Sequence, residues 1–268
     1  MDAITISDQE FGQFREMLRR LVGINLSPAK KPLVCSRLEK RLRHHRLDSY
    51  GEYYCLIQSG QAPSELQTAV DLLTTNETYF FREEKHFEFL ADKALAGWPR
   101  GQPFRAWSAA SSSGEEAYSI AMLLADKLGD SPWEVVGTDI STRVLEKAVA
   151  GHYSLDRTGG IPPGYLQSYC LKGIGAQHGT FLIGKELRNR VRFMQLNLCA
   201  DLPGMGSFDV IFLRNVMIYF EPATKRQVVA RLTPLLKPGG HFIIGHSESL
   251  NGINDQMKLV APTIYRKP

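Results

Sequence analysis

The sequence predicts an α/β protein in which a mostly parallel, doubly wound sheet follows a small all-helical domain. From residue 104 onward, apolar runs typical of buried strands alternate with amphipathic segments typical of helices. Before residue 76, apolar residues instead recur at helical spacing. The last two apolar runs, near 258–260 and 263–266, have no helix between them, so we expect an antiparallel hairpin at the edge of the sheet.

Residues 1–75 are expected to form the helical domain. Ser7 and Glu10 make a capping box at the start of a helix that Gly23 ends. The apolar residues Phe11, Phe14, Leu18 and Leu21 follow the spacing of one helix face. The further helices expected here begin near Pro32 and cover Tyr50–Ser59 and Ser64–Leu73.

Residues 76–96 are expected to link the helical domain to a ligand-binding domain over 97–268. The strands expected in this domain are Phe104–Ala109, Trp133–Thr138, Val191–Gln195, Phe208–Leu213 and His241–Gly245. The helices expected are Lys85–Ala96, Ala117–Leu128 and Ala223–Leu236. A glycine-rich stretch at 171–187, containing the apolar run Thr180–Ile183, is expected to form a small inserted β-subdomain.

Composition narrows the class of protein. With 43% hydrophobic and 22% charged residues in 268, the chain has the composition of an ordinary globular protein. It has no apolar run long enough for a membrane span and no signal peptide at its start. Its widely separated cysteines, which are Cys35, Cys55, Cys170 and Cys199, form no metal-binding or disulfide pattern. We therefore expect a cytoplasmic protein without a metal and without membrane insertion.

The net charge of +4 is concentrated in one segment. Residues 30–46 hold seven basic residues and one acid, a net +6, which leaves the rest of the chain at −2. Arg37, Lys40, Arg41 and His44 have the spacing of one helix face. Such a patch favours an acidic partner, and a merely solvated face is the alternative.

The first expected strand runs into a turn of small residues and a helix that begins near Glu115 and Glu116. Nucleotide-like ligands bind at such junctions in α/β folds. This turn has neither a Gly-x-Gly-x-x-Gly nor a Gly-Lys-Ser/Thr pattern, and its two acids would repel a pyrophosphate. A cationic cofactor without phosphate, such as S-adenosylmethionine, suits it better.

Three further positions follow expected strands. Asp139 ends the second strand, where an acid either binds ribose hydroxyls or caps the next helix at Ser141. Asn197 and Leu198 follow Val191–Gln195, so they either contact adenine or lie in a surface loop. Arg214 directly follows a fully apolar strand, a position poorly suited to a core and well suited to a site.

Several motifs, in this order along the chain, closely resemble those of the CheR family, the chemotaxis receptor glutamate methyltransferases of bacteria. The resemblance spans nearly the whole chain. The motifs are Asn-Glu-Thr-Tyr-Phe-Phe-Arg-Glu (76–83), Trp-Ser-Ala-Ala-Ser-Ser-Ser-Gly-Glu-Glu-Ala-Tyr-Ser-Ile-Ala (107–121), Thr-Asp-Ile-Ser (138–141), Leu-Arg-Asn-Val-Met-Ile-Tyr-Phe (213–220) and Gly-His-Ser-Glu-Ser (245–249).

The resemblance implies a class I S-adenosylmethionine-dependent methyltransferase fold and a set of site residues. Arg82, Arg214 and Tyr219 are implied as catalytic. The residues implied to contact the cofactor are Asn76, Thr78, Arg82, Glu116, Asp139, Asn197, Leu198, Leu213 and Arg214. The basic helix, through Arg37, Lys40, Arg43 and Arg46, is implied to dock on the receptor. No metal is implied.

The implied reaction moves the methyl group of S-adenosylmethionine to receptor glutamates, giving methyl esters and S-adenosylhomocysteine. A glutamate is already ionised at neutral pH, so the site needs no general base. What it must supply is positioning, which is worth about 7–11 kcal/mol. We expect Arg214 and Tyr219 to hold the carboxylate and Arg82, in the linker, to close over the cofactor.

The resemblance also names partners. They are the acidic helices of a chemoreceptor's cytoplasmic region and, through the β-subdomain, a receptor's C-terminal pentapeptide bound by strand addition. Thr180–Ile183 is long enough to offer the edge for such a strand, and an inert hairpin is the alternative. Two alternatives are open at this stage. One is a catalytically silent S-adenosylmethionine-binding scaffold, and the other is a nucleic-acid methyltransferase. The basic helix lacks interleaved aromatic residues, which disfavours nucleic acid.

Overall fold

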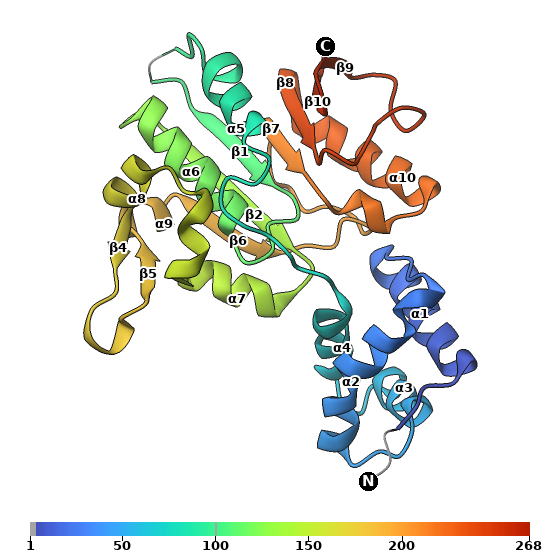
Figure 1. The fold of residues 1–268 in the computed structure, drawn as a ribbon. Helices are drawn as coiled ribbons and strands as arrows, with labels where there is room; N and C mark the ends of the chain where they lie inside the picture. Colours follow the sequence, from blue (N-terminus) through green and yellow to red (C-terminus); the bar gives the residue numbers. More distant parts are fainter. Residues whose placement is uncertain (1–3, 100) are drawn as a thin grey trace.

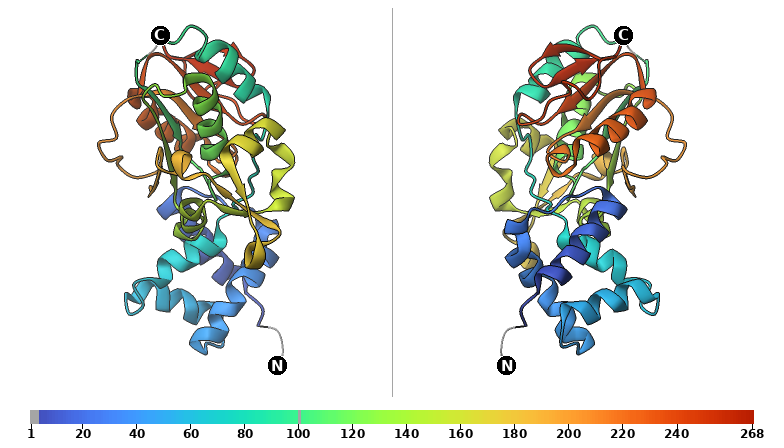
Figure 2. Two further views of the ribbon diagram at one scale, coloured as in Figure 1. Left: turned by 90° about the vertical axis from the view of Figure 1, so that its left-hand side faces the viewer. Right: turned by 90° about the vertical axis from the view of Figure 1, so that its right-hand side faces the viewer.

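The computed structural model describes residues 4–99 and 101–268 (Figure 1). The first three residues of the expected helical domain and residue 100 of the expected ligand-binding domain lie outside this part of the chain. The fold is the expected one, with a helical N-terminal domain, a mostly parallel sheet flanked by helices and a small antiparallel sheet. Both views in Figure 2 show the N-terminal helices gathered at the end of the molecule opposite the C-terminus.

The helical domain follows the sequence signals closely. Ser7 and Glu10 form the predicted capping box, and Gly23, at φ 75°, ends the first helix in the left-handed region. Apolar side chains of all the longer helices meet in one core, since Phe14, Leu38 and Tyr53 are fully buried. The helices are α1 (Asp8–Val22), α2 (Lys31–His45), α3 (Tyr50–Ser59) and α4 (Glu65–Leu73), with a 3₁₀ turn at Pro28–Lys30.

The central sheet has seven strands in the order β6-β2-β1-β7-β8-β10-β9. All neighbours are parallel except at one edge, where β10 is antiparallel to both β8 and β9, as the hairpin prediction requires. The strands are β1 (Phe104–Ser108), β2 (Trp133–Asp139), β6 (Val191–Gln195), β7 (Phe208–Leu213), β8 (Leu236–Ile244), β9 (Lys258–Ala261) and β10 (Ile264–Arg266).

β8 begins before the expected start at His241. Leu236 already pairs with Phe208, and a register shift between Phe208 and Val210 accommodates the intervening residues. The Pro-Gly-Gly that follows Lys237 therefore lies within the strand and not after a helix. A proline is tolerated in a strand at such an irregularity, which the sequence alone does not reveal.

Helices cover both faces of the sheet. Alternate residues of β7 point to opposite faces: Ile211 and Leu213 join the core under α10, while Val210 and Phe212 join the core under α6. The helices of this domain are α5 (Lys85–Phe89), α6 (Glu115–Leu128), α7 (Thr142–Ala150), α8 (Pro163–Tyr169), α9 (Lys185–Arg188) and α10 (Pro222–Leu232). A π-helical turn, Leu90–Ala94, continues α5.

The inserted sheet has three strands, β3 (His152–Ser154), β4 (Cys170–Lys172) and β5 (Thr180–Ile183), in the order β3-β5-β4. It therefore draws on chain before residue 171, the start expected from the glycine-rich stretch. β5 pairs on both sides, so the expectation that Thr180–Ile183 offers a free edge is wrong. Three-residue β3 is too short to be recognised in the sequence, and it takes the position that a partner strand would need.

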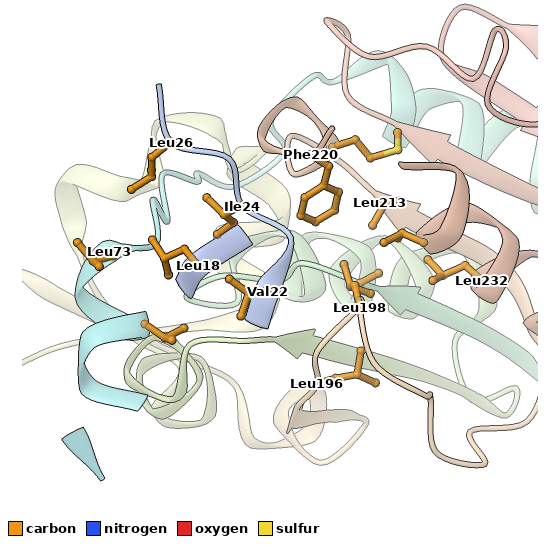
Figure 3. Close-up of a cluster of buried hydrophobic side chains, with 14 of the residues drawn as sticks. Leu18, Val22, Ile24, Leu26, Leu73, Leu196, Leu198, Leu213, Phe220 and Leu232 are labelled. Carbon is orange, nitrogen blue, oxygen red and sulfur yellow. The ribbon is translucent and has the colours of Figure 1, made fainter. Parts of the chain in front are cut away.

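The two domains share a hydrophobic core (Figure 3). Leu18, Val22 and Ile24 of the helical domain pack with Leu198 and Phe220 of the sheet domain, and all five are buried. The close-up shows these side chains converging from both parts of the chain. Burial of apolar surface on this scale joins the domains into one unit.

Polar contacts fix the same junction. The Asp71 carboxylate, at the end of α4, accepts hydrogen bonds from the Thr142 N–H (3.0 Å) and the Thr142 hydroxyl (2.7 Å). Asp71 thereby caps the first turn of α7 across the domain boundary, where a helix favours negative charge. On the other side of the junction, the Asn197 amide donates to the Leu21 carbonyl (2.7 Å). No helix in the described part of the chain is long and apolar enough to span a membrane.

Candidate functional site

A cavity of about 350 Å³ lies between the helical domain and the carboxyl ends of the central strands. Ligands bind at this edge in open α/β sheets, and the volume lies in the range of small-molecule sites. The residues that line it from the sheet domain and linker are Thr75, Asn76, Glu77, Thr78, Arg82, Ala109, Ala110, Ser112, Glu116, Asp139, Ile140, Leu196, Asn197, Leu198, Arg214, Asn215, Val216, Ile218, Tyr219 and Phe220. The helical domain adds Val22, Ile24, Asn25, Leu26, Ser27, Lys30, Leu33, Leu73 and Thr74.

Asp139 holds the loop that closes the first turn. Its carboxylate accepts hydrogen bonds from the Ser112 N–H (2.9 Å) and the Ser141 N–H (3.0 Å). Asp139 therefore caps the start of α7, as one sequence interpretation has it, and it also lines the cavity, where the other interpretation needs it. Burial raises the pKa of Asp139, and the N–H groups of Ser141 and Ser112 oppose that rise. Each oxygen retains a lone pair for a ligand hydroxyl.

The two acids that follow the turn have separate roles. Glu116 lines the cavity, and one of its oxygens accepts from the Ser108 hydroxyl (2.7 Å). Glu115 points away, is fully buried and pairs with Arg157. The expectation that both acids face the ligand is therefore wrong for Glu115. Burial raises the pKa of Glu115, and hydrogen bonds from Ser113 and Arg157 oppose the rise.

Gly114 is required by packing and not by ligand contact. Its φ is +96°, and an added Cβ would lie 2.9 Å from the Cβ of Ala148 and 3.0 Å from the Tyr153 hydroxyl. A side chain at this position would push the turn off α7 and the inserted sheet. The glycine thus lets the first turn approach the second helix closely.

Arg214 lies at the carboxyl end of β7 and is the buried cation of the site. Its guanidinium pairs with Glu116 (2.8 Å) and with Glu83 (3.0 Å), and it also donates to the Arg82 carbonyl. Its Nε is buried and has no hydrogen-bond partner among the described residues. A buried N–H without a partner is costly, so this donor is available for a bound anion or acceptor.

Sequence reasoning assigned no role to Glu83 or Glu248, which hold Arg214 and the loop after it. Glu248 accepts hydrogen bonds from the N–H groups of Asn215 (2.9 Å), Gly245 (2.7 Å) and Ile218 (3.2 Å). Burial raises the pKa of Glu248, and these N–H groups oppose the rise. Both acids lie in motifs of the resemblance, which was the available signal, but their partners are distant in the sequence.

Backbone strain is concentrated at the same place. Six non-glycine residues in the described part of the chain have φ between 48° and 60°, in the left-handed region, and four of them surround Arg214 and the cavity. These four are Phe81 (φ 54°), Glu83 (φ 60°), Ser112 (φ 48°) and Asn215 (φ 56°). Such conformations cost about 1–3 kcal/mol each and persist where the surroundings enforce them. Their clustering supports a functional site here.

The linker runs between the helical domain and the sheet domain (Figure 1), and several of its residues line the cavity. The Ser112 hydroxyl donates to the Asn76 carbonyl (2.9 Å), and the Phe81 N–H donates to the Ser119 hydroxyl (2.9 Å). Arg82 is half-buried and lines the cavity, and its side chain donates one hydrogen bond, to the Glu77 carbonyl (3.1 Å). Asn76 and Thr78 also line the cavity, so the linker residues expected at the cofactor are brought together there.

Three predicted cofactor residues differ in their placement. Leu198 lines the cavity. Asn197 also lines it, but its side-chain amide is engaged by the Leu21 carbonyl (2.7 Å) and by the Cys199 N–H (2.9 Å). Leu213 is fully buried in the shared core instead (Figure 3). A direct Leu213 side-chain contact with the cofactor therefore does not fit this structure, because the strand alternation turns it inward.

Tyr219 lies in the 3₁₀ turn Met217–Tyr219 and lines the cavity beside Ile218 and Phe220. Its carbonyl accepts a hydrogen bond from the Asn25 N–H (2.9 Å) of the helical domain. The wall supplied by the helical domain was not expected from the sequence. The segment after α1 gave no chemical signal, since its role depends on how the two domains pack.

The basic face of α2 is divided by its contacts. Arg37 is half-buried and donates to the carbonyls of Leu73 (3.1 Å) and Thr74 (2.8 Å), and Arg41 pairs with Glu65 (2.7 Å). Arg37 therefore supports the end of α4 and does not face outward as expected. Helical spacing put it on a basic face, but its partners lie in another helix.

The other predicted docking residues are exposed. These are Lys40, Arg43 and Arg46. Arg43 is partly neutralised, since it forms an ion pair with Glu39 (2.5 Å) within the same helix. The outward-facing positive charge of α2 is therefore carried by three residues near its C-terminal end.

The comparisons with known proteins agree with this site. Residues 76–266 match the family described as CheR methyltransferase, SAM binding domain, and residues 9–74 match CheR methyltransferase, all-alpha domain. The chain is 42% identical over 267 residues to a chemotaxis protein methyltransferase of Escherichia coli, covering 98% of this chain and 92% of that protein. It is 44% identical over 260 residues to chemotaxis protein methyltransferase 2 of Pseudomonas aeruginosa, covering 96% and 92%.

The doubly wound sheet, with an acid-lined cavity at the carboxyl ends of its strands, defines an S-adenosylmethionine-dependent methyltransferase of the α/β class. Within that class, the chain belongs to the CheR methyltransferase family.

We predict that Asp139→Asn and Glu116→Gln each weaken binding of S-adenosylhomocysteine by about 10- to 100-fold. Each change keeps the shape of a cavity side chain and removes its charge, and a hydrogen bond to a charged group is worth about 1.5–3 kcal/mol. Calorimetric titration measures the affinity, and circular dichroism checks the fold. Glu146→Gln, on the exposed side of α7, is the matched control. Wild-type affinity in both cavity variants would contradict the assignment.

Proposed function

We propose that the protein transfers the methyl group of S-adenosylmethionine to glutamate side chains of chemoreceptor signalling proteins. The observation that supports this proposal most strongly is the burial of the Arg214 guanidinium at the end of β7. Its Nε has no hydrogen-bond partner among the described residues, and Arg214 lines the same cavity as Tyr219. The names of the relatives, chemotaxis protein methyltransferases, support the same substrate class. The products are a glutamyl methyl ester and S-adenosylhomocysteine.

The residues present fit the cofactor. Bound there, S-adenosylmethionine supplies an activated methyl group on a sulfonium. Asp139 offers acceptors for ribose hydroxyls, and Glu116 offers negative charge next to a cationic ligand. Asn76 and Thr78 line the same wall, and the backbone around Asn197 and Leu198 forms the opposite one. Arg82 and Lys30 are the cavity cations with no ion pair among the described residues; Arg82 lies in the linker beside Asn76 and Thr78, so we assign it to the cofactor's carboxylate.

Arg214 and Tyr219 are assigned to the substrate. The charge of Arg214 is compensated by Glu116 and Glu83, so the guanidinium orients an incoming carboxylate without strongly quenching its nucleophilicity. The Tyr219 hydroxyl donates a second hydrogen bond from the 3₁₀ turn after β7. The chain then contributes orientation and exclusion of water, which suits a nucleophile that is already ionised.

The exposed end of α2 is proposed as the receptor-docking surface, made of Lys40, Arg43 and Arg46. It belongs to the same helical domain that closes the cavity, so a receptor bound there is held near the site. The acidic helices of a receptor's cytoplasmic region complement its charge, and the protein is accordingly assigned to the cytoplasm.

The inserted sheet is proposed as a tether for a receptor's C-terminal pentapeptide. Its free edges are β3 and β4, because β5 is central. On β4, Leu171 faces Leu182 between the hydrogen bonds that join Gly173 to Thr180 and Gly184 to Tyr169. By antiparallel alternation, the N–H of Lys172 points to the free side, whereas the N–H of Cys170 is bonded to the Leu166 carbonyl at the end of α8. Leu171 is 60% exposed and Ile174 is 82% exposed, which supplies apolar contact beside this edge.

For the reaction itself, we expect labelled methyl groups to be transferred from the cofactor to receptors in membranes of the protein's own organism and to be released by mild alkali, as esters are. Tyr219→Phe should lower turnover about tenfold or more with cofactor affinity unchanged, since it removes one hydrogen bond to the substrate. Tyr79→Phe removes a hydroxyl outside the cavity and is the matched control. Label that is not released by alkali would contradict the assignment of the product as a glutamyl methyl ester.

For docking, we expect Lys40→Ala, Arg43→Ala and Arg46→Ala together to raise the KM for receptor and to flatten its dependence on salt. Exposed charges steer encounters in a way that ionic strength screens. Affinity for S-adenosylhomocysteine should not change. The charge-matched control replaces three exposed lysines of the sheet domain, which are Lys93, Lys127 and Lys258. The same rise in the KM for receptor in both triple variants would contradict a specific role of α2 in docking.

For the tether, we expect Lys172→Pro to abolish binding of receptor C-terminal pentapeptides, measured by calorimetry, while Lys172→Ala binds like the wild type. Proline removes the outward N–H without removing a hydrogen bond to β5. Equal binding by the two variants would exclude strand addition at β4, and no binding by the wild type at millimolar peptide would exclude the tether.

A further inference from the structure

Three residues with metal-binding side chains meet behind Arg214, outside the cavity lining. Glu83, His86 and His246 each offer one ligand atom, and these atoms all lie within 4.8 Å of one another. His86 Nδ1 is 3.4 Å from Glu83 Oε2, and His246 Nε2 is 3.9 Å from the same oxygen. Glu83 and His86 come from the end of the linker and the start of α5, and His246 follows β8.

His86 presents a lone pair to a carboxylate. The Thr263 hydroxyl donates its hydrogen to the Pro262 carbonyl (2.6 Å), so its oxygen can only accept from His86. The His86 Nε2, at 2.8 Å from this oxygen, therefore carries the ring proton. His86 Nδ1 is then an acceptor that faces a second acceptor, Glu83 Oε2. It is fully buried and has no hydrogen-bond partner among the described residues.

Two acceptors facing each other in a buried site are stabilised by a cation placed between them. The second nitrogen of His86 is fixed by Thr263, which is the arrangement that orients histidine ligands of metals.

We propose that Glu83, His86 and His246 form a binding site for a zinc ion. Two imidazoles and one carboxylate, with a fourth position open, are a recurring zinc ligand set. Tetrahedral bonds of about 2.0–2.1 Å place ligand atoms about 3.4 Å apart. The His86–Glu83 pair already has that separation, and His246, which is 53% exposed, is free to turn the remaining distance.

The local charge allows a dication despite the nearby guanidinium. Three carboxylates lie near the Arg214 guanidinium. Glu83 and Glu116 form ion pairs with it, and Glu248 accepts a hydrogen bond from the N–H of the next residue, Asn215. His86 and His246 add no charge when neutral. The formal excess is therefore two negative charges, which a zinc ion balances.

Zinc binding would be coupled to the methyl-transfer site through one atom. Glu83 Oε2 accepts hydrogen bonds from Arg214 and from the His246 N–H (3.2 Å), so an ion on this oxygen competes with Arg214 for it. Arg214 would then keep Glu116 as its ion-pair partner, together with its hydrogen bond to the Arg82 carbonyl, and would shift in the cavity. Zinc bound at this site would therefore inhibit methyl transfer.

The test is titration of the full-length protein with Co²⁺, which substitutes for Zn²⁺ and reports its ligands by visible absorption. We use a Cys55→Ser background, because Cys55 is an exposed thiol. We expect one Co²⁺ per chain, with the d–d bands of a four-coordinate site, no thiolate charge-transfer band, and displacement by Zn²⁺. His246→Ala should weaken binding at least about tenfold, since even an outer partner is worth about 10- to 100-fold.

His178→Ala removes an equally exposed histidine from the inserted sheet and should bind Co²⁺ like the parent protein. Saturating Zn²⁺ should lower methyl transfer in the parent and not in His246→Ala. Equal Co²⁺ affinity in His246→Ala and the parent would overturn the site, as would a thiolate band. Undiminished methyl transfer with Zn²⁺ bound would overturn the competition with Arg214. The Co²⁺ titration stays interpretable if receptor methylation fails, because metal binding needs no substrate, whereas the test of competition with Arg214 rests on the proposed function.

Discussion

The arrangement of the site depends on one buried guanidinium. Arg214 ends a fully apolar strand, and a charge in that position is stable only if it is paired and hydrogen-bonded. Its partners come from two different places: Glu116 from α6, and Glu83 with the adjacent Arg82 carbonyl from the linker. Removing one partner of such a buried pair costs about 3–5 kcal/mol. The linker is therefore fixed against the sheet by electrostatics as well as by packing.

The helical domain completes the cavity because the two domains share a core and a set of polar contacts. Asp71 caps α7, the helix that begins just after Asp139, so the loop that carries Asp139, the proposed ribose acceptor, is held from the other domain. Asn25 likewise holds the turn of Tyr219 through its carbonyl. The helical domain thus contributes a wall and braces two of the loops that carry assigned cavity residues.

Much of the fold could be predicted from local pattern. Strands such as β7 are continuous apolar runs, and the capping box at Ser7 and Glu10 marks a helix start without reference to the rest of the chain. Arg214 was found because a charge at the end of such a strand is unusual. What local pattern could not give are contacts between distant residues.

The differences from prediction have that common cause. Arg37 looks exposed by helical spacing but bonds to carbonyls in another helix. β5 looks like an edge because the three residues of β3 carry no readable signal. Glu83 and His246 are brought together where the linker meets the end of β8. The argument against a metal considered only the spacing of cysteines, so it did not detect this cluster of distant residues.

The charges of the cavity suit a reaction that consumes a positive and a negative charge. The charged lining residues are balanced, with Lys30, Arg82 and Arg214 against Glu77, Glu116 and Asp139. Methyl transfer from a sulfonium to a carboxylate converts two ions into two neutral groups, and water slows such a step by solvating the ions better than the transition state. A closed cavity without net charge removes that solvation and favours neither ion alone. On this argument, closure by the helical domain contributes to the rate as well as to binding.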